Sequence, residues 1–199
     1  MSETHRRERF QLEDGDLDLS NLIGISTGGP PALRRLFKLL PADIKGSVLV
    51  VQHMPPIFTA QLAESLNEES ALTVVEATSG ALPQPATVYI APGGKQMRLK
   101  QGSQNDAVIL VEDSDPKELC KPSVNILFNS VAEFCAEETL AIIMTGMGED
   151  GYMGMKALSA GGAYLMAQSQ HDCVIFGMPA KPIRDGIIDE EHDVEGLAK

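Results

Sequence analysis

Short apolar runs alternate with segments of helical periodicity from residue 21 onward. Residues 47–51, Ser-Val-Leu-Val-Val, and residues 139–144, Thr-Leu-Ala-Ile-Ile-Met, are apolar at nearly every position. Such runs are typical of strands buried on both faces of a parallel sheet. A further apolar run begins at residue 21, and the residues after it place Leu33, Leu36, Phe37 and Leu40 on one helical face. Successive strand–helix units predict a doubly wound sheet with right-handed crossovers.

The middle of the chain has a different pattern. Four short strand-like runs are separated by turns that contain Gly or Pro: residues 72–76, 87–91, 96–100 and 107–112. We expect them to form an antiparallel insertion. Helical spacing returns at residues 123–135, and closing elements are predicted as strands at 163–168 and 174–176 and a short helix at 179–184. The predicted class is α/β: a three-layer, doubly wound, mostly parallel, Rossmann-like sheet with a short antiparallel insertion.

The two ends of the chain lack this periodicity. Residues 1–20 mix basic and acidic side chains without an apolar period and are predicted to be a flexible tail. Residues 191–199 are predicted to be a C-terminal tail, which leaves one domain at residues 21–190.

Composition narrows the classes of partner. The net charge of −12 and the pI of about 4.7 speak against nucleic acid and anionic membranes, which attract basic surfaces. No apolar run reaches the roughly 18 residues of a membrane span, and the first twenty residues lack a signal-peptide core, so a cytoplasmic location is predicted. Cys120, Cys135 and Cys173 are an odd, widely spaced set without a Cys-x-x-Cys pair. We interpret them as buried thiols and expect no cofactor and no metal.

The first candidate for chemistry is Ser26. It lies in Gly24-Ile25-Ser26-Thr27-Gly28, a G-x-S-x-G pattern between a predicted strand and a predicted helix. This is the pattern of a nucleophile elbow, in which the N–H groups of the helix start can stabilise an oxyanion. A phosphate-binding turn or a helix-capping serine fits the same residues.

Two further strands of the parallel type end close to reactive side chains, His53 and Asp150. Because the carboxyl ends of parallel strands share one edge of a sheet, Ser26, His53 and Asp150 are expected to lie near one another. Histidine supplies the base that a serine hydroxyl needs, and a carboxylate orients the imidazole. Thr27 and the backbone around Met147 are candidates for oxyanion donors or for shaping the pocket.

Each of these side chains has alternatives. His53 alone fits a hydrogen-bonded loop histidine, and Asp150 alone fits a helix N-cap. Glu149 competes as the carboxylate, and His171 and His192 compete as the base. In the chain order of α/β-hydrolases, His171 is the natural choice. The residues by themselves leave these alternatives open.

Six segments in order resemble the catalytic domain of the chemotaxis protein-glutamate methylesterases, the CheB family: residues 23–30, 50–59, 89–93, 122–128, 144–151 and 173–179. The resemblance extends from residue 21 to about residue 189. It implies a serine hydrolase with the triad Ser26, His53 and Asp150, on a doubly wound fold distinct from the α/β-hydrolases. It also implies that the substrates are glutamyl methyl esters on the cytoplasmic helices of methyl-accepting chemoreceptors in bacterial chemotaxis, with deamidation of glutamines in some members.

The chain departs from the family pattern in two ways. The best-known members carry a receiver domain ahead of the esterase, whereas about twenty residues precede the first strand here. Control by a fused receiver is therefore not expected, and a separate regulatory protein becomes a candidate partner. Lys121 and Asn125 stand where the family usually has Arg and Asp, and Lys does not replace the bidentate fork of Arg. These two substitutions put the substrate specificity in question.

Three other functions share features with this sequence. A nucleotide-binding oxidoreductase is disfavoured because the second strand ends in Gln52-His53 instead of an acidic residue and the first turn lacks G-x-G-x-x-G spacing. A non-catalytic adaptor of the same fold would have no physical need to retain all three triad side chains. A serine esterase that acts on another protein remains compatible with the sequence.

Overall fold

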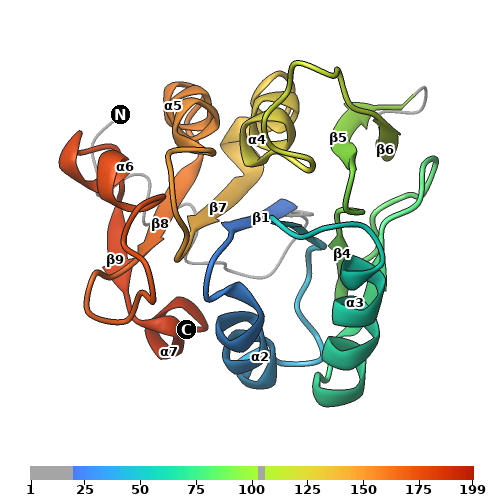
Figure 1. Ribbon diagram of the computed structural model, residues 1–199, viewed down its shortest axis with the longest axis horizontal. Helices are drawn as coiled ribbons and strands as arrows, with labels where there is room; N and C mark the ends of the chain where they lie inside the picture. The colour runs from blue at the N-terminus through green and yellow to red at the C-terminus, as the bar shows by residue number, and fades with distance from the viewer. Residues whose placement is uncertain (1–19, 103–105) are drawn as a thin grey trace.

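The computed structural model describes residues 20–102 and 106–199 (Figure 1). Within them, seven parallel strands form one sheet in the order β3-β4-β2-β1-β7-β8-β9. The strands are β1 (Ser20–Ile25), β2 (Val48–Gln52), β3 (Thr73–Glu76), β4 (Thr87–Ile90), β7 (Thr139–Ile143), β8 (Tyr164–Gln168) and β9 (Glu190–His192). Because β2, β3 and β4 lie on one side of β1 and β7, β8 and β9 lie on the other, this topology confirms the predicted doubly wound α/β fold. The predicted tail at residues 1–20 falls almost entirely outside the described residues.

Helices cover both faces of the sheet, so the molecule has three layers (Figure 1). The helices α2 (Gly29–Leu39), α3 (Phe58–Glu69) and α7 (Val194–Leu197) lie on one face, and α4 (Val124–Ala132) and α5 (Tyr152–Ala160) lie on the other. The short helix α6 (Ala180–Arg184) and a turn of 3-10 helix at Ala136–Glu138 are the remaining helices of the described residues. Each face buries its own apolar cluster, because β1, β2 and β7 send alternate side chains to opposite sides.

The predicted antiparallel insertion is smaller than expected. Of the four strand-like runs in residues 72–112, only β5 (Lys95–Gln101) and β6 (Ala107–Asp113) pair in antiparallel fashion. The first two runs are β3 and β4, which lie in the main sheet and are parallel to each other and to β2. The assignment of those two runs to the insertion was wrong. The reason is that Val74, Val88 and Ile90 pack with Leu62 and Leu66 of α3 in one buried cluster, which holds both strands on the sheet.

A second difference concerns residues 174–176, which were predicted to be a strand. They form a loop, and only Phe176 makes a bridge, a parallel pairing with Gly146. Val174 is 68% exposed, so the apolar character of this segment lies on the surface and does not form a strand of the core.

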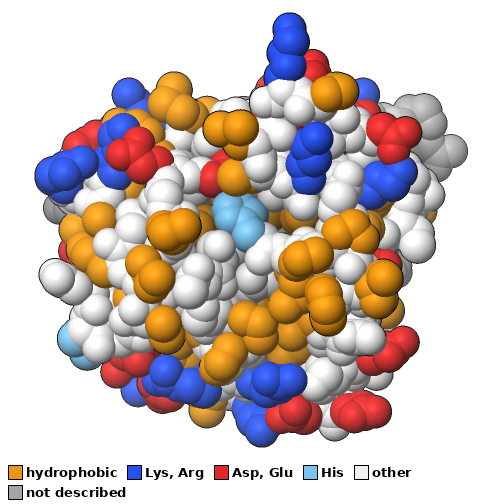
Figure 2. Space-filling view, viewed as in Figure 1, with side chains coloured by type: hydrophobic (Ala, Val, Ile, Leu, Met, Phe, Trp, Pro, Cys, Tyr) orange, Lys and Arg blue, Asp and Glu red, His pale blue; other side chains and the backbone are white. Residues whose placement is uncertain are grey.

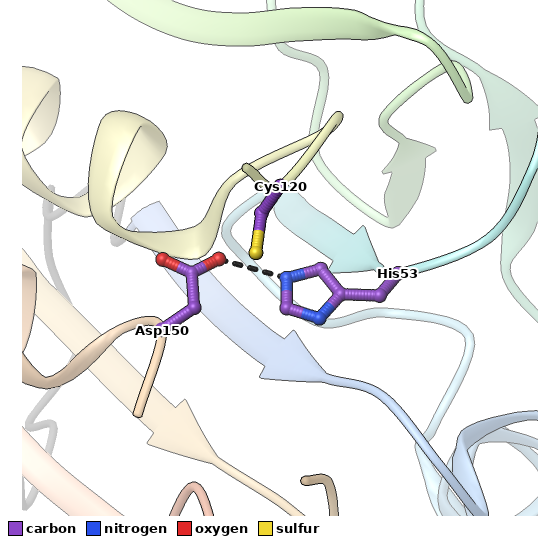
Figure 3. Close-up of side chains that lie close together, drawn as sticks. All are labelled: His53, Cys120 and Asp150. Atoms are coloured by element: carbon purple, nitrogen blue, oxygen red, sulfur yellow. Dashed lines mark hydrogen bonds and ion pairs between the residues drawn. The ribbon is translucent and has the colours of Figure 1, made fainter. Parts of the chain in front are cut away.

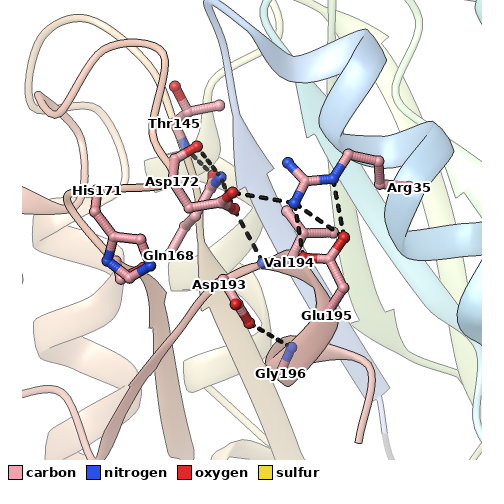
Figure 4. A network of polar contacts seen from close by, with 10 residues as sticks. Arg35, Thr145, Gln168, His171, Asp172, Asp193, Val194, Glu195 and Gly196 are labelled. Atoms are coloured by element: carbon pink, nitrogen blue, oxygen red, sulfur yellow. Dashed lines mark hydrogen bonds and ion pairs between the residues drawn. The ribbon is translucent and has the colours of Figure 1, made fainter.

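The C-terminal residues 191–199 are folded, although the sequence analysis treated them as a tail. β9 extends the sheet beside β8, and α7 buries Val194 and Leu197. Asp172 holds α7 in place, since its carboxylate accepts hydrogen bonds from Val194 N at 3.0 Å and from the Arg35 guanidinium of α2 at 3.0 Å (Figure 4). The sequence analysis missed this segment because three-residue strands and one-turn helices are too short to show a period.

The packing of α4 against α5 fixes the start of α4, which lies close to the predicted site residue Asp150. Gly154 of α5 lets the two helices pack closely: a Cβ at this position would lie 2.4 Å from Phe128 Cβ. Phe128 is fully buried in the cluster beneath both helices. Among the described residues, no helix has the length and apolar character that crossing a membrane requires.

We predict that Phe128→Ala lowers the free energy of unfolding by about 3–5 kcal/mol, because it removes a large buried ring and leaves a cavity. Leu119→Ala is the control, since Leu119 is 98% exposed and its truncation should change stability by less than about 0.5 kcal/mol. Urea unfolding monitored by circular dichroism measures both. Equal effects of the two substitutions would contradict the assigned core.

Candidate active site

Ser26 lies in the turn between β1 and α2, where the sequence analysis predicted it. Its backbone N–H donates to Thr145 O at 2.9 Å, and its carbonyl accepts from Gly29 N at 2.8 Å and from Gln52 Nε2 at 3.1 Å. These bonds fix the backbone of Ser26 between β1, β2 and the turn after β7. The residue is half-buried, so it remains reachable from solvent.

Glycines make this turn sterically feasible. Gly28, at the N-cap of α2, has φ 86°, a left-handed conformation that favours glycine. Gly146 faces Ser26 across the site, and a Cβ at this position would lie 2.7 Å from Ser26 Cβ. Substitution at either position would therefore displace the turn that carries Ser26.

His53 follows β2 and lies beside Ser26 because of the strand register. β1 and β2 are parallel with Ile25 opposite Gln52, and His53 N donates to Ile25 O at 3.1 Å. The next residues along the two strands are therefore Ser26 and His53. Gln52 Nε2 donates to the carbonyls of both, at 3.1 and 3.0 Å, and so ties the two backbones together. The sequence analysis assigned no role to Gln52, and nothing in its pattern indicated this link.

Asp150 completes the arrangement from the turn after β7. Its Oδ2 lies 2.7 Å from His53 Nε2 (Figure 3). The carboxylate also sits at the N-terminus of α4, where it accepts hydrogen bonds from Ser123 Oγ at 2.9 Å, Val124 N at 2.7 Å and Asn125 N at 3.0 Å. Free N–H groups and the helix dipole favour a negative charge at this point.

This environment keeps Asp150 ionised. Burial by itself raises the pKa of the carboxyl, but the hydrogen bonds from His53, Asn125 and Val124 more than offset it, so the pKa of Asp150 lies below its ordinary value. With Asp150 as acceptor, a neutral His53 carries its proton on Nε2. The unprotonated nitrogen is then Nδ1, which is the atom available to act as a base.

The residues that competed for these roles in the sequence are engaged elsewhere. Glu149 pairs with Lys181 at 2.7 Å, and its side chain is 62% exposed. His192 lies 2.6 Å from Glu190, and His171 lies 3.5 Å from a serine hydroxyl two residues before it in the chain. The geometry therefore brings Asp150 together with His53 and not with His171 or His192.

The two residues predicted to shape the pocket, Thr27 and Met147, both lie at the surface. Thr27 is exposed, and its carbonyl accepts from Thr145 Oγ1 at 2.9 Å, while Met147 is 71% exposed. Ile57 and Phe58, at the start of α3, are also exposed apolar side chains. Figure 2 shows hydrophobic side chains gathered around a histidine on this face. Ile57 has φ 77°, a strained conformation for a β-branched residue.

Asn125, one of the two departures from the family pattern, faces away from the site. Its Oδ1 accepts a hydrogen bond from Gly154 N at 2.9 Å, which connects α4 to the start of α5. An amide oxygen accepts this bond as a carboxylate oxygen would. The other departure, Lys121, is fixed by its backbone, whose carbonyl accepts from Gly94 N at 3.1 Å.

The three cysteines are half-buried thiols. Burial raises the pKa of Cys135 and of Cys173 to about 11 in each case. Cys120 differs in its location: its Sγ, a ring nitrogen of His53 and an Asp150 carboxylate oxygen lie within 4.8 Å of one another (Figure 3). Burial, and then the Asp150 carboxylate, raises the pKa of Cys120. The sequence analysis missed this contact because residues far apart in the chain form it.

We predict that Asp150→Asn makes the free energy of unfolding depend less steeply on pH in the acidic range. A carboxyl whose pKa is lower in the folded than in the unfolded state stabilises the fold fully above the unfolded pKa, about 3.9. That contribution is lost as the pH falls from there through the folded pKa. Urea unfolding at a series of acidic pH values measures the effect, with Asp43→Asn as an exposed control. If the free energy of unfolding of Asp150→Asn fell as steeply at acidic pH as that of the wild type, the lowered pKa of Asp150 would be contradicted.

Comparison with known proteins identifies the family that the chain resembles. Residues 21–199 match a family model described as CheB methylesterase. The chain is 44% identical over 169 residues to a protein-glutamate methylesterase/protein-glutamine glutaminase of Desulfotalea psychrophila, covering 84% of the chain and 46% of that relative. It is 44% identical over 177 residues to the Bacillus subtilis protein of the same name, covering 88% and 49%. The chain thus spans about half the length of the curated relatives it matches.

A solved structure extends the comparison to the fold. The catalytic domain of the CheB methylesterase from Thermotoga maritima superimposes with a TM-score of 0.87 at 36% sequence identity. The match covers 90% of this chain and 95% of that domain. The resemblance drawn from six sequence segments is therefore confirmed over nearly the whole described chain.

Proposed function

Because this chain belongs to the CheB methylesterase family, we propose that it is a serine hydrolase that removes methyl groups from glutamyl methyl esters and that Ser26, His53 and Asp150 are its catalytic residues. The observation that carries the proposal is the 2.7 Å contact between His53 and Asp150, placed beside the Ser26 turn by the β1–β2 register. A serine needs such a base, and the base needs such a carboxylate, to work near neutral pH.

The reaction follows from the roles of these atoms. Ser26 Oγ attacks the ester carbonyl carbon while His53 Nδ1 takes its proton, which gives a tetrahedral oxyanion. Collapse breaks the bond to the methoxy group, and the imidazolium returns the proton to release methanol. Water then attacks the acyl-serine with His53 again as base, which frees the glutamate carboxylate and restores Ser26. Asp150 stays ionised throughout and stabilises the imidazolium.

Thr27 and Met147 are proposed to border the oxyanion. Thr27 directly follows Ser26 and precedes the N-terminus of α2, where N–H groups and the helix dipole favour negative charge. Met147 lies in the turn whose neighbouring glycine, Gly146, faces Ser26. Donors positioned before the oxyanion forms need no reorganisation when it appears.

The proposed substrates are the cytoplasmic helices of chemoreceptors, and the proposed location is therefore the cytoplasm. Glutamine side chains of the same helices are a second substrate on this proposal, because an amide can also acylate Ser26, with ammonia in place of methanol as the leaving group. A separate regulatory protein is a further proposed partner.

Replacing Ser26 with Ala should lower methanol release from a methylated chemoreceptor fragment by more than about 10³-fold, because no acyl-serine can form. The midpoint of thermal unfolding should change little, since the hydrogen bonds that fix Ser26 are made by its backbone. A vapour-phase assay with a radiolabelled methyl ester follows the release. Residual activity together with a large loss of stability would identify Ser26 as a structural turn residue.

His53→Ala and His171→Ala form a matched pair that tests the choice of base. We expect His53→Ala to reduce the rate of methanol release by more than about 10³-fold and His171→Ala to leave it within about twofold of the wild type. Initial rates at saturating receptor fragment give the comparison. The opposite ranking would restore the α/β-hydrolase order and remove His53 from the site.

A further inference from the structure

A thiol lies beside the proposed catalytic pair, and the mechanism above does not use it. Cys120 Sγ, His53 and Asp150 present sulfur, nitrogen and oxygen ligand atoms within 4.8 Å of one another (Figure 3). The three come from separate places in the fold: the loop between β6 and α4, the end of β2 and the turn after β7. We propose that these three side chains bind a thiophilic divalent cation of the zinc class, and that the bound ion inhibits the hydrolase. The inhibitory part of this inference rests on the proposed function, whereas the binding part does not.

The ligand chemistry selects the class of ion. Zinc binds thiolate, imidazole and carboxylate ligands, and three protein ligands with water in the fourth tetrahedral position is a common arrangement. Magnesium and calcium require sites built from oxygen ligands and are disfavoured by a thiol and an imidazole. The cluster therefore fits zinc, and also cobalt(II) as a spectroscopic substitute.

The geometry needs only a small adjustment. His53 Nε2 and Asp150 Oδ2 are 2.7 Å apart, whereas two ligands of a tetrahedral zinc ion lie about 3.3 Å apart at ordinary bond lengths. A shift of about 0.6 Å, within reach of a side-chain rotation, admits the ion. Oδ1 accepts from Ser123 Oγ at 2.9 Å and from Asn125 N and Gly151 N at 3.0 Å each, and Oδ2 accepts from Val124 N at 2.7 Å as well as from His53. The backbone bonds can hold the carboxylate while the lone pair of Oδ2 that accepts from His53 binds the metal instead.

The backbone that carries Cys120 is fixed by a buried side chain. Gln96 is 2% exposed, and its Nε2 donates to Cys120 O at 2.8 Å while its Oε1 accepts from Ser123 N at 2.8 Å. One amide thus fixes the backbone on both sides of the segment that carries the thiol. A ligand preorganised in this way loses little freedom when the metal binds.

Inhibition follows from the position of the ring proton. In the arrangement described above, His53 carries its proton on Nε2 and accepts the Ser26 proton on Nδ1. A metal on Nε2 requires the electron pair of that nitrogen, so the proton moves to Nδ1 and the base is lost. The thiol proton of Cys120 passes to water on binding, and the thiolate and the Asp150 carboxylate together balance the two positive charges of the ion.

Direct titration of zinc chloride by calorimetry, in a buffer that does not bind metals, tests the site on the full chain. We compare the wild type with Cys120→Ser and with Cys173→Ser, a half-buried thiol outside the cluster. Cys120→Ser should weaken zinc binding by at least about tenfold, and Cys173→Ser should match the wild type. Cobalt(II) should give a thiolate charge-transfer band in the near ultraviolet that only Cys120→Ser removes. Equal zinc affinity in all three proteins, or a band that survives in Cys120→Ser, would overturn the proposal.

Methanol release gives the second part of the test. Zinc should inhibit the wild type and Cys173→Ser, a chelator should restore their rates, and Cys120→Ser should resist inhibition when each rate is scaled to that variant's own metal-free value. Undiminished release at zinc concentrations that saturate the calorimetric site would overturn the inhibitory role. Ser26→Ala retains all three ligands and should bind zinc as the wild type does. If no protein releases methanol but zinc binding still depends on Cys120, the proposed function fails while the metal site stands.

Discussion

The hydrogen bond between His53 Nε2 and Asp150 Oδ2 is the contact on which the proposed chemistry depends. It joins the end of β2 to the turn after β7, and β1 lies between these two strands in the sheet. The carboxylate is held on its other side by the N-terminus of α4, which lowers its pKa although it is buried. A protonated Asp150 could neither orient the imidazole nor balance its charge, so the position of α4 matters to the chemistry as much as the strands do.

The packing of α4 holds the N-terminus of this helix beside Asp150. α4 is fixed from below by the apolar cluster under Phe128 and from the side by α5, whose Gly154 permits the close approach. Asn125 adds a hydrogen bond between the two helices and donates its own N–H to Asp150. A core residue, a contact between helices and the proposed catalytic carboxylate are therefore connected within about one turn of α4, and a change in the core can reach the site through that helix.

Elements that are encoded by a local pattern of residues could be predicted from the sequence. Contacts between residues far apart in the chain could not. The buried runs of β1, β2 and β7 were recognisable because continuous apolar strands with helical connections indicate a parallel sheet. The convergence of Ser26, His53 and Asp150 followed from the rule that parallel strands end at one edge. Their assignment over His171 came from the family resemblance and not from the residues, because a distance across the fold has no local signal.

The same limit explains what was missed. β3 and β4 were assigned to the insertion because a short apolar run bounded by turn residues has the same pattern whether its partner strand is parallel or antiparallel. Gln52, Ser123 and Cys120 lie in the site through side chains whose partners are distant in the chain. The C-terminal segment of β9 and α7 is too short to have a detectable period and is held through tertiary contacts of Asp172.

Covalent labelling with a fluorophosphonate, followed by peptide mass spectrometry, tests the central claim most directly, because the probe reacts only with a serine that a neighbouring base activates. The arrangement described here predicts a single phosphonylated residue, Ser26, and loss of the adduct in His53→Ala. An adduct on a different serine, or labelling of Ser26 at an unchanged rate without His53, would contradict it.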